Sequence, residues 1–113
     1  MRRPRIGPNA FAALATCLTP LTNLEALIVR ENSIGPEGAE HLAEGIRGLT
    51  DLKVLDLGFS RVGRKGGLAL AARTRWLTAL QKLKFEGNSM GQDAVSQIQT
   101  TLPEGCTLEI DGA

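Results

Sequence analysis

The stretch that decides the fold is Leu24-Glu25-Ala26-Leu27-Ile28-Val29-Arg30-Glu31-Asn32-Ser33-Ile34-Gly35. Its apolar residues alternate around Ile28, which is typical of a strand that buries one of its faces. Asn32 follows where the chain must turn, and an Asn side chain can bond loop backbone groups that would otherwise be buried and unpaired. We expect Leu27 and Val29 to face the core. The positions expected on the open side are Ala26, Ile28 and Arg30.

The same pattern returns twice further along the chain. Leu21-Thr22, Leu49-Thr50 and Leu77-Thr78 open successive copies, which places the copies 28 residues apart. A fixed period of roughly 20–50 residues indicates a repeat architecture in which each unit buries its apolar faces against its neighbours. After each strand pattern, apolar residues recur three and four apart, as in Ala39, Leu42 and Ile46, and this spacing predicts a helix with one buried face.

The repeat predicts an α/β solenoid: a parallel sheet lines a concave face and helices line the convex face. We predict strands at about 26–29, 54–57, 82–85 and 108–110, and helices at about 8–18, 36–47, 64–74 and 92–101. A single domain, 1–113, then contains a half repeat (1–20), three full repeats (21–48, 49–76, 77–104) and a terminal strand or cap (105–113). Pro36 suits the first turn of its helix because that turn leaves backbone N–H groups unpaired.

These residues resemble the leucine-rich-repeat family, whose pattern is LxxLxLxxNxL. The repeat length and the helix entry Ile34-Gly35-Pro36-Glu37-Gly38 resemble its ribonuclease-inhibitor-like branch. The resemblance extends from about Ile6 to Ile110. It implies a horseshoe segment whose default partners are proteins. Ser60 departs from the pattern at the Asn position, and its smaller side chain can satisfy less of the loop backbone.

The N-terminal half repeat has no strand of its own in this register. Strand 26–29 is therefore expected to present an open edge to which another chain can add. Two explanations remain open: the chain is a fragment of a longer repeat array, or a partner covers that edge in a larger assembly. Alone, the chain is expected to be marginally stable and to self-associate.

Composition narrows the class of protein. Hydrophobic residues make up 42% of the chain, which argues against wholesale disorder, and the formal net charge of +1 gives no general attraction to nucleic acid or membranes. Cys17 and Cys106 are expected to be free thiols in an intracellular, cytoplasmic protein. Met1-Arg2-Arg3 and the apolar run at 10–15 imitate a signal peptide, but the repeat explains the apolar run better. No apolar run approaches the roughly 18 residues of a membrane span.

Catalytic motifs are missing from the sequence, so we expect no enzyme, no cofactor and no metal site. His41 is the single histidine and falls on an outward helix position, where it has no nucleophile to activate. Gly63-x-x-Gly66-Gly67 belongs to the repeat and lacks the Lys-Ser/Thr of a phosphate-binding loop.

The concave face is the first candidate site, because its outward positions combine apolar and charged residues as protein interfaces do. Register should bring Ile28, Asp56 and Lys84 side by side, and Asp56 with Lys84 could equally form a solvated cross-strand ion pair. The partner-binding residues expected there are Ile28, Arg30, Glu31, Val54, Asp56, Phe59, Lys84 and Glu86.

A basic convex segment, Arg61 to Trp76, is the second candidate. Trp76 is an addition to the repeat, since its equivalents are Gly48 and Pro20. An aromatic residue beside Arg73 and Arg75 can anchor a protein or stack on a base, or it can simply cover its own helix end. The leading hypothesis is a non-enzymatic protein-binding scaffold subunit. An RNA-associated subunit that uses this segment is the alternative, and a small-GTPase regulator ranks below both.

Overall fold

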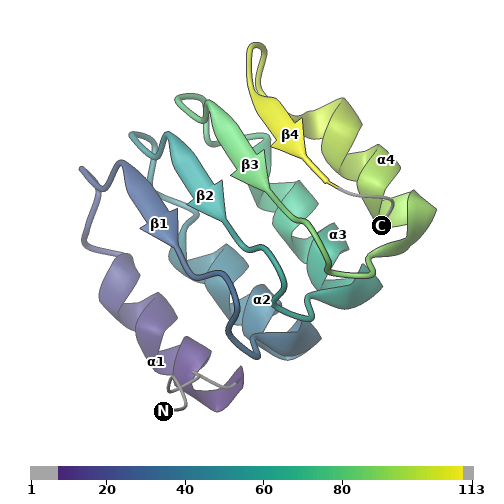
Figure 1. Cartoon of the computed structure of the whole chain (residues 1–113). Coiled ribbons are helices and arrows are strands. Elements are labelled where there is room, and N and C mark those ends of the chain that lie inside the picture. Colours follow the sequence, from purple (N-terminus) through teal and green to yellow (C-terminus); the bar gives the residue numbers. More distant parts are fainter. Residues whose placement is uncertain (1–7, 111–113) are drawn as a thin grey trace.

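The computed structural model describes residues 8–110, which form alternating helices and strands in two layers (Figure 1). The helices are α1 (Pro8–Leu18), α2 (Gly35–Gly45), α3 (Gly63–Thr74) and α4 (Gly91–Thr101). The strands are β1 (Ala26–Ile28), β2 (Val54–Asp56), β3 (Lys82–Lys84) and β4 (Thr107–Glu109). They form one parallel sheet in the order β1-β2-β3-β4, with all helices on one side of it. The predicted α/β solenoid is confirmed.

The first three strands are each one residue shorter than predicted and β4 begins one residue earlier, but pairing continues beyond the ends of β1 and β2. The backbone N–H of Val29 donates to the Asp56 carbonyl at 2.9 Å, and that of Leu57 donates to the Lys84 carbonyl at 2.8 Å. The helices begin one residue before the predicted starts at Gly35, Gly63 and Gly91. Ile6-Gly7, which the repeat register also includes, lies outside the described residues.

Register confirms which strand positions face the core. Leu27 pairs with Leu55, Leu55 with Leu83, and Leu83 with Leu108, so one row of leucines runs across the inner face of the sheet. Leu55 and Leu83 are fully buried between sheet and helices. Because side chains alternate along a strand, the next row points to the concave side. That row is Ile28, Asp56, Lys84 and Glu109.

Glycine lets the helices approach each other closely. A Cβ added to Gly45 would lie 2.7 Å from the Cα of Ala15, so α1 and α2 can pack at this distance because position 45 has no side chain. Leu42, Ile46 and Leu70, on the inner faces of the helical layer, are fully buried against the sheet. Successive repeats therefore stack with closely spaced helices and with a core of leucine side chains between the helices and the sheet.

Buried polar residues hold the turns that follow the strands. The Asn88 Oδ1 accepts the backbone N–H groups of Ser60 at 2.9 Å and Val62 at 3.1 Å, and its Nδ2 donates to the Leu57 carbonyl at 2.7 Å. Ser60 reaches less of the loop: its hydroxyl donates to the carbonyl of Gly58 at 3.0 Å or of Val29 at 3.4 Å. This difference is the one expected from the departure at position 60.

The first repeat covers its apolar residues less completely than the next one. Leu24 and Leu27 are half-buried, whereas their equivalents Leu52 and Leu55 are fully buried. Within the described part of the chain, β1 has β2 as its one neighbour in the sheet. The expected open edge at this strand is therefore present in residues 8–110.

Candidate functional site

Concave-face side chains come from β1, β2, β3 and the turns at their carboxyl ends. Ile28, the last residue of β1, lies on the open side of this strand and is 62% exposed. Val54, two positions before Asp56 and on the same face of β2, is half-buried. The sheet thus presents an apolar spot at β1 with charged side chains beside it.

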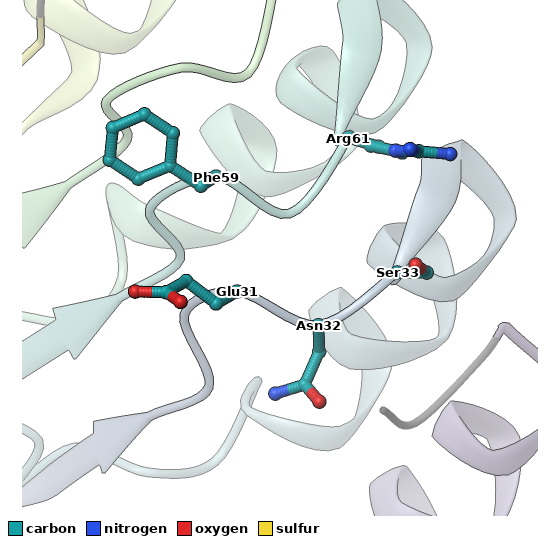
Figure 2. A pocket seen from close by; sticks show the side chains of 5 residues that line it. All are labelled: Glu31, Asn32, Ser33, Phe59 and Arg61. Carbon is teal, nitrogen blue, oxygen red and sulfur yellow. The ribbon is translucent and has the colours of Figure 1, made fainter. Parts of the chain in front are cut away.

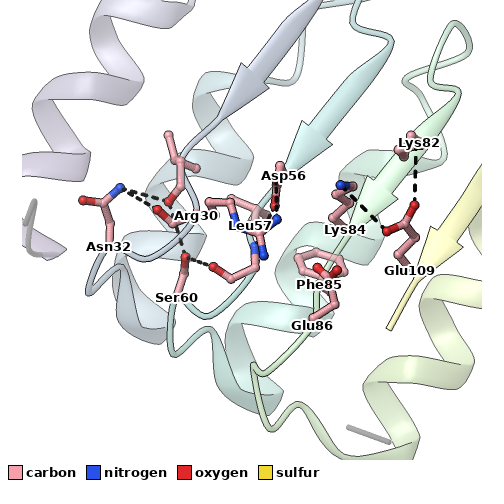
Figure 3. A network of polar contacts seen from close by, with 12 residues as sticks. Arg30, Asn32, Asp56, Leu57, Ser60, Lys82, Lys84, Phe85, Glu86 and Glu109 are labelled. Carbon is pink, nitrogen blue, oxygen red and sulfur yellow. Dashed lines mark hydrogen bonds and ion pairs between the residues drawn. The ribbon is translucent and has the colours of Figure 1, made fainter. Parts of the chain in front are cut away.

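Asp56 corrects part of the sequence-based expectation. It lies beside Ile28 and Lys84 as the register requires, but it is 5% exposed, and its ion pair is with Arg30 rather than with Lys84. The Arg30 Nη1 donates to the Asp56 Oδ2 at 2.8 Å, and the Asp56 Oδ1 accepts the Gly58 N–H at 3.0 Å (Figure 3). Both carboxylate oxygens therefore have a donor, so the role of Asp56 is to hold Arg30 and the Gly58 backbone in place.

Gly58 makes the Arg30–Asp56 arrangement possible. A Cβ at position 58 would lie 2.9 Å from the Arg30 Nη2, so the guanidinium occupies space that any other residue would fill. The hydrogen bond with Asp56 raises the pKa of Arg30 above its ordinary value, against an opposing effect of burial. The charges of Asp56, Glu86 and Glu31 add to that increase in pKa.

Phe59 lies on the turn after β2, where it is 51% exposed. The Arg30 guanidinium carbon lies 5.7 Å from the centre of its ring, within the range of a cation–π contact. The ring also rests on the backbone at Gly87, since a Cβ there would lie 2.3 Å from the Phe59 Cδ1. Glu31, Phe59 and Gly87 are equivalent repeat positions, and all three have left-handed backbones, with φ of 62°, 53° and 69°.

Arg30, Gly58 and Glu86 are equivalent repeat positions, so Gly58 lies between the other two, and Glu86 contacts it from the β3 side. Its Oε1 is 3.1 Å from the position that a Gly58 Cβ would take. This oxygen is buried and accepts no hydrogen bond from any described residue. An unpaired buried acceptor is costly because it has lost its water without gaining a donor.

The remaining concave charges are paired around Glu109. Lys82 and Lys84 lie 3.6 Å and 3.8 Å from its two carboxylate oxygens (Figure 3). Sequence reasoning assigned Lys84 to the face but overlooked Glu109. Its position in the row of Ile28, Asp56 and Lys84 is the signal that could have identified it.

A shallow pocket of about 380 Å³ opens beside this surface, lined by Glu31, Asn32, Ser33, Phe59 and Arg61. Figure 2 shows the Phe59 and Glu31 side chains on the sheet side of the pocket and Arg61 and Ser33 toward the helices. The Asn32 Nδ2 donates to the Val29 carbonyl at 3.0 Å, as expected for the Asn position of the repeat. The pocket lies at the edge of the concave face, along the turns that lead from β1 to α2 and from β2 to α3.

Most of the basic convex segment is paired. Arg73 lies 2.8 Å from Glu44, Arg64 lies 3.3 Å from Asp93, and Lys65 lies 3.8 Å from Glu40. The Arg75 guanidinium lies 5.4 Å from the centre of the Trp76 ring, and Trp76 is 61% exposed. Arg75 and Trp76 thus form an exposed stack, while the other cations named here have nearby carboxylates.

Features that could support catalysis are sparse in the described residues. His41 is exposed on α2, as predicted, and no group of three His, Cys, Asp or Glu residues within 8–110 could hold a metal ion. Cys17 and Cys106 are free thiols, and burial raises the pKa of the Cys106 thiol. None of the described helices is long and apolar enough to cross a membrane.

Comparison with known families agrees with this geometry. The family model described as Leucine Rich repeat matches residues 21–43 and 48–71. Each match contains one strand and most of the helix that follows it, β1 with α2 and β2 with α3. No curated protein is significantly similar to the chain. The two matches support a leucine-rich-repeat family, and the chain has the α/β leucine-rich-repeat solenoid fold.

Proposed function

We propose that this chain is a non-enzymatic interaction module that binds a protein partner on its concave sheet face. The observation that carries the proposal is the exposure of Ile28 and Phe59 on that face. Large apolar side chains in a charged rim are typical of protein interfaces, because burying them on binding is favourable. Repeat solenoids also offer long concave surfaces suited to this use.

Contacts within the chain brace this face, which supports the role. The Arg30–Asp56 ion pair, the Asp56–Gly58 hydrogen bond and the contact of Phe59 with Gly87 hold the side chains in place. A preordered surface loses little conformational entropy on binding, so more of the contact energy appears as affinity. In this proposal, Val54 and Lys84 complete the contact surface around Ile28.

The finer assignments belong to the same proposal. The 28-residue repeat supports the ribonuclease-inhibitor-like branch. The open edge at β1 supports a role within a larger assembly or a longer repeat array. RNA binding through Arg73, Arg75 and Trp76 has weaker support because Arg73 is committed to Glu44. Within residues 8–110, no feature favours regulation of a small GTPase.

Affinity capture from native extract tests the proposal with two matched variants. The concave variant carries Ile28→Glu and Lys84→Ala, which replace exposed or half-exposed side chains and keep the Arg30–Asp56 pair. The convex variant carries Arg75→Glu and Trp76→Ala, both at exposed positions. We expect one set of proteins to be lost from the concave variant alone. Loss of ribonuclease-sensitive material from the convex variant alone would instead support the RNA alternative.

A further inference from the structure

The pairing of charges on the concave face is uneven. Each described cation there has a carboxylate within ion-pair distance: Arg30 has Asp56, and Lys82 and Lys84 share Glu109. Glu86 has no ion-pair partner within residues 8–110, and its Oε1 accepts no hydrogen bond there. Arg30 also lies against Gly58, but its ion pair is with Asp56, so Glu86 is the carboxylate at the carboxyl ends of β2 and β3 that has no ion pair within residues 8–110.

Phe59 supplies a second element of recognition at the same place. Its backbone N–H donates to the Glu86 carbonyl at 2.7 Å, and its ring rests on Gly87, so ring and carboxylate are neighbours. The ring is half exposed and already takes one cation, Arg30, at cation–π distance. An aromatic ring beside a carboxylate is a favourable environment for a guanidinium or ammonium group, which bonds the carboxylate and lies against the ring.

We propose that the protein partner presents a basic segment to this face, with an arginine or lysine side chain bound between Glu86 and Phe59. This inference rests on the proposed function and adds the chemistry of the partner. An acidic group at this point would meet Glu86 directly and would have to displace Asp56 to reach Arg30. A basic group instead balances the charge of the Glu86 carboxylate, which has no ion pair within residues 8–110, whereas the charge of the neighbouring Arg30 is already balanced by Asp56.

The surplus positive charge of the face lies elsewhere, where Lys82 and Lys84 share one carboxylate. Lys84 lies in the row of Asp56, whereas Glu86 lies in the row of Gly58, nearer the turns. The bound segment is therefore oriented with its basic side chain toward the strand ends and the pocket beside Phe59. Like charges facing each other are costly, so the reverse orientation is disfavoured.

A titration of the full chain with two synthetic peptides tests the inference, followed by the backbone amide signals in two-dimensional NMR. One peptide alternates Arg and Gly, and the other alternates Glu and Gly. We expect the arginine peptide to shift the amides of Gly58, Phe59 and Gly87. Because a charge-assisted hydrogen bond is lost, Glu86→Gln should weaken that binding about tenfold. The matched control is Asp93→Asn, the same change of charge on the convex side at α4.

Equal shifts with the glutamate peptide, or equal effects of Glu86→Gln and Asp93→Asn, would overturn the inference. So would changes in the amides of Arg2, Arg3 and Arg5 when Glu86→Gln is made without peptide, because the basic segment would then be this chain's own. Such results leave the proposed function standing if the Ile28→Glu, Lys84→Ala variant still loses its captured proteins. If that variant captures the same proteins as the unchanged chain, the proposed function itself is contradicted.

Discussion

Asn88 is the side chain whose removal should most weaken the stacking of the second and third repeats. It is 1% exposed, and its Oδ1 accepts hydrogen bonds from the backbone N–H groups of Ser60 and Val62. Its Nδ2 donates to the carbonyls of Leu57 at 2.7 Å and Phe85 at 3.0 Å. Asn88→Ala removes these four contacts and a longer one to the Glu86 carbonyl at 3.3 Å, and it leaves buried backbone groups without partners.

The expected cost follows from the two buried N–H groups. Each unsatisfied buried donor costs about 1–3 kcal/mol, so Asn88→Ala should lower the free energy of unfolding by about 2–6 kcal/mol. Ser60→Ala is the matched control, because it removes one buried hydroxyl donor at the equivalent repeat position and should cost about 1 kcal/mol. Small domains have a free energy of unfolding of about 5–15 kcal/mol, so Asn88→Ala should remove a large share of the stability of this one.

Urea denaturation followed by circular dichroism measures both changes. The Asn88→Ala midpoint should fall well below that of Ser60→Ala, with similar slopes showing that both variants expose the same surface on unfolding. A loss for Asn88→Ala within about 1 kcal/mol of the Ser60→Ala loss would refute the reasoning, since the hydrogen bonds between repeats would then contribute little.

Three further predictions concern single residues. Gly87→Ala should lower the free energy of unfolding by about 1–2 kcal/mol, because φ is +69° at this position and the new methyl group meets Phe59. Adding Phe59→Ala should restore only the part of that loss that comes from the contact, as a double-mutant cycle measured by urea denaturation would show. Trp76→Ala should change the free energy of unfolding by less than about 1 kcal/mol, because the ring is 61% exposed; a larger loss in thermal unfolding would contradict this. Cys106 should react with iodoacetamide with a pH midpoint above that of an ordinary thiol, measured by mass spectrometry of its peptide. Because the folded state keeps that proton longer, stability should fall as the pH rises from the ordinary thiol pKa toward the raised value.

The faces and register of the sheet could be predicted because they follow from periodicity alone. Side chains alternate strictly along a strand, so the positions of Leu27 and Leu55 determine that Ile28 and Asp56 lie together on the other face. Repeat spacing then places Lys84 beside Asp56. No contact energies enter this argument, which is why it succeeded.

Which side chains pair could not be predicted, because pairing depends on reach and on the size of neighbours. The alternative of an Asp56–Lys84 ion pair is not the one that forms: Arg30 reaches Asp56 across Gly58, which has no side chain to block it, and Lys84 pairs with Glu109. Spacing also gives no measure of burial, so Asp56 was expected at the surface. The left-handed turn at Phe59 did have a signal in the sequence, since its equivalent is Gly87, but one glycine among three equivalents is a weak one.

The most direct test of the central claim is site-specific photo-crosslinking in native extract. A photoreactive amino acid replaces Ile28 on the concave face or, as the matched position, Ala72 on the exposed side of α3. Concave binding predicts a discrete crosslinked protein from position 28 and none of that species from position 72. The same adduct from both positions, or from position 72 alone, would contradict the claim that the partner binds the concave sheet.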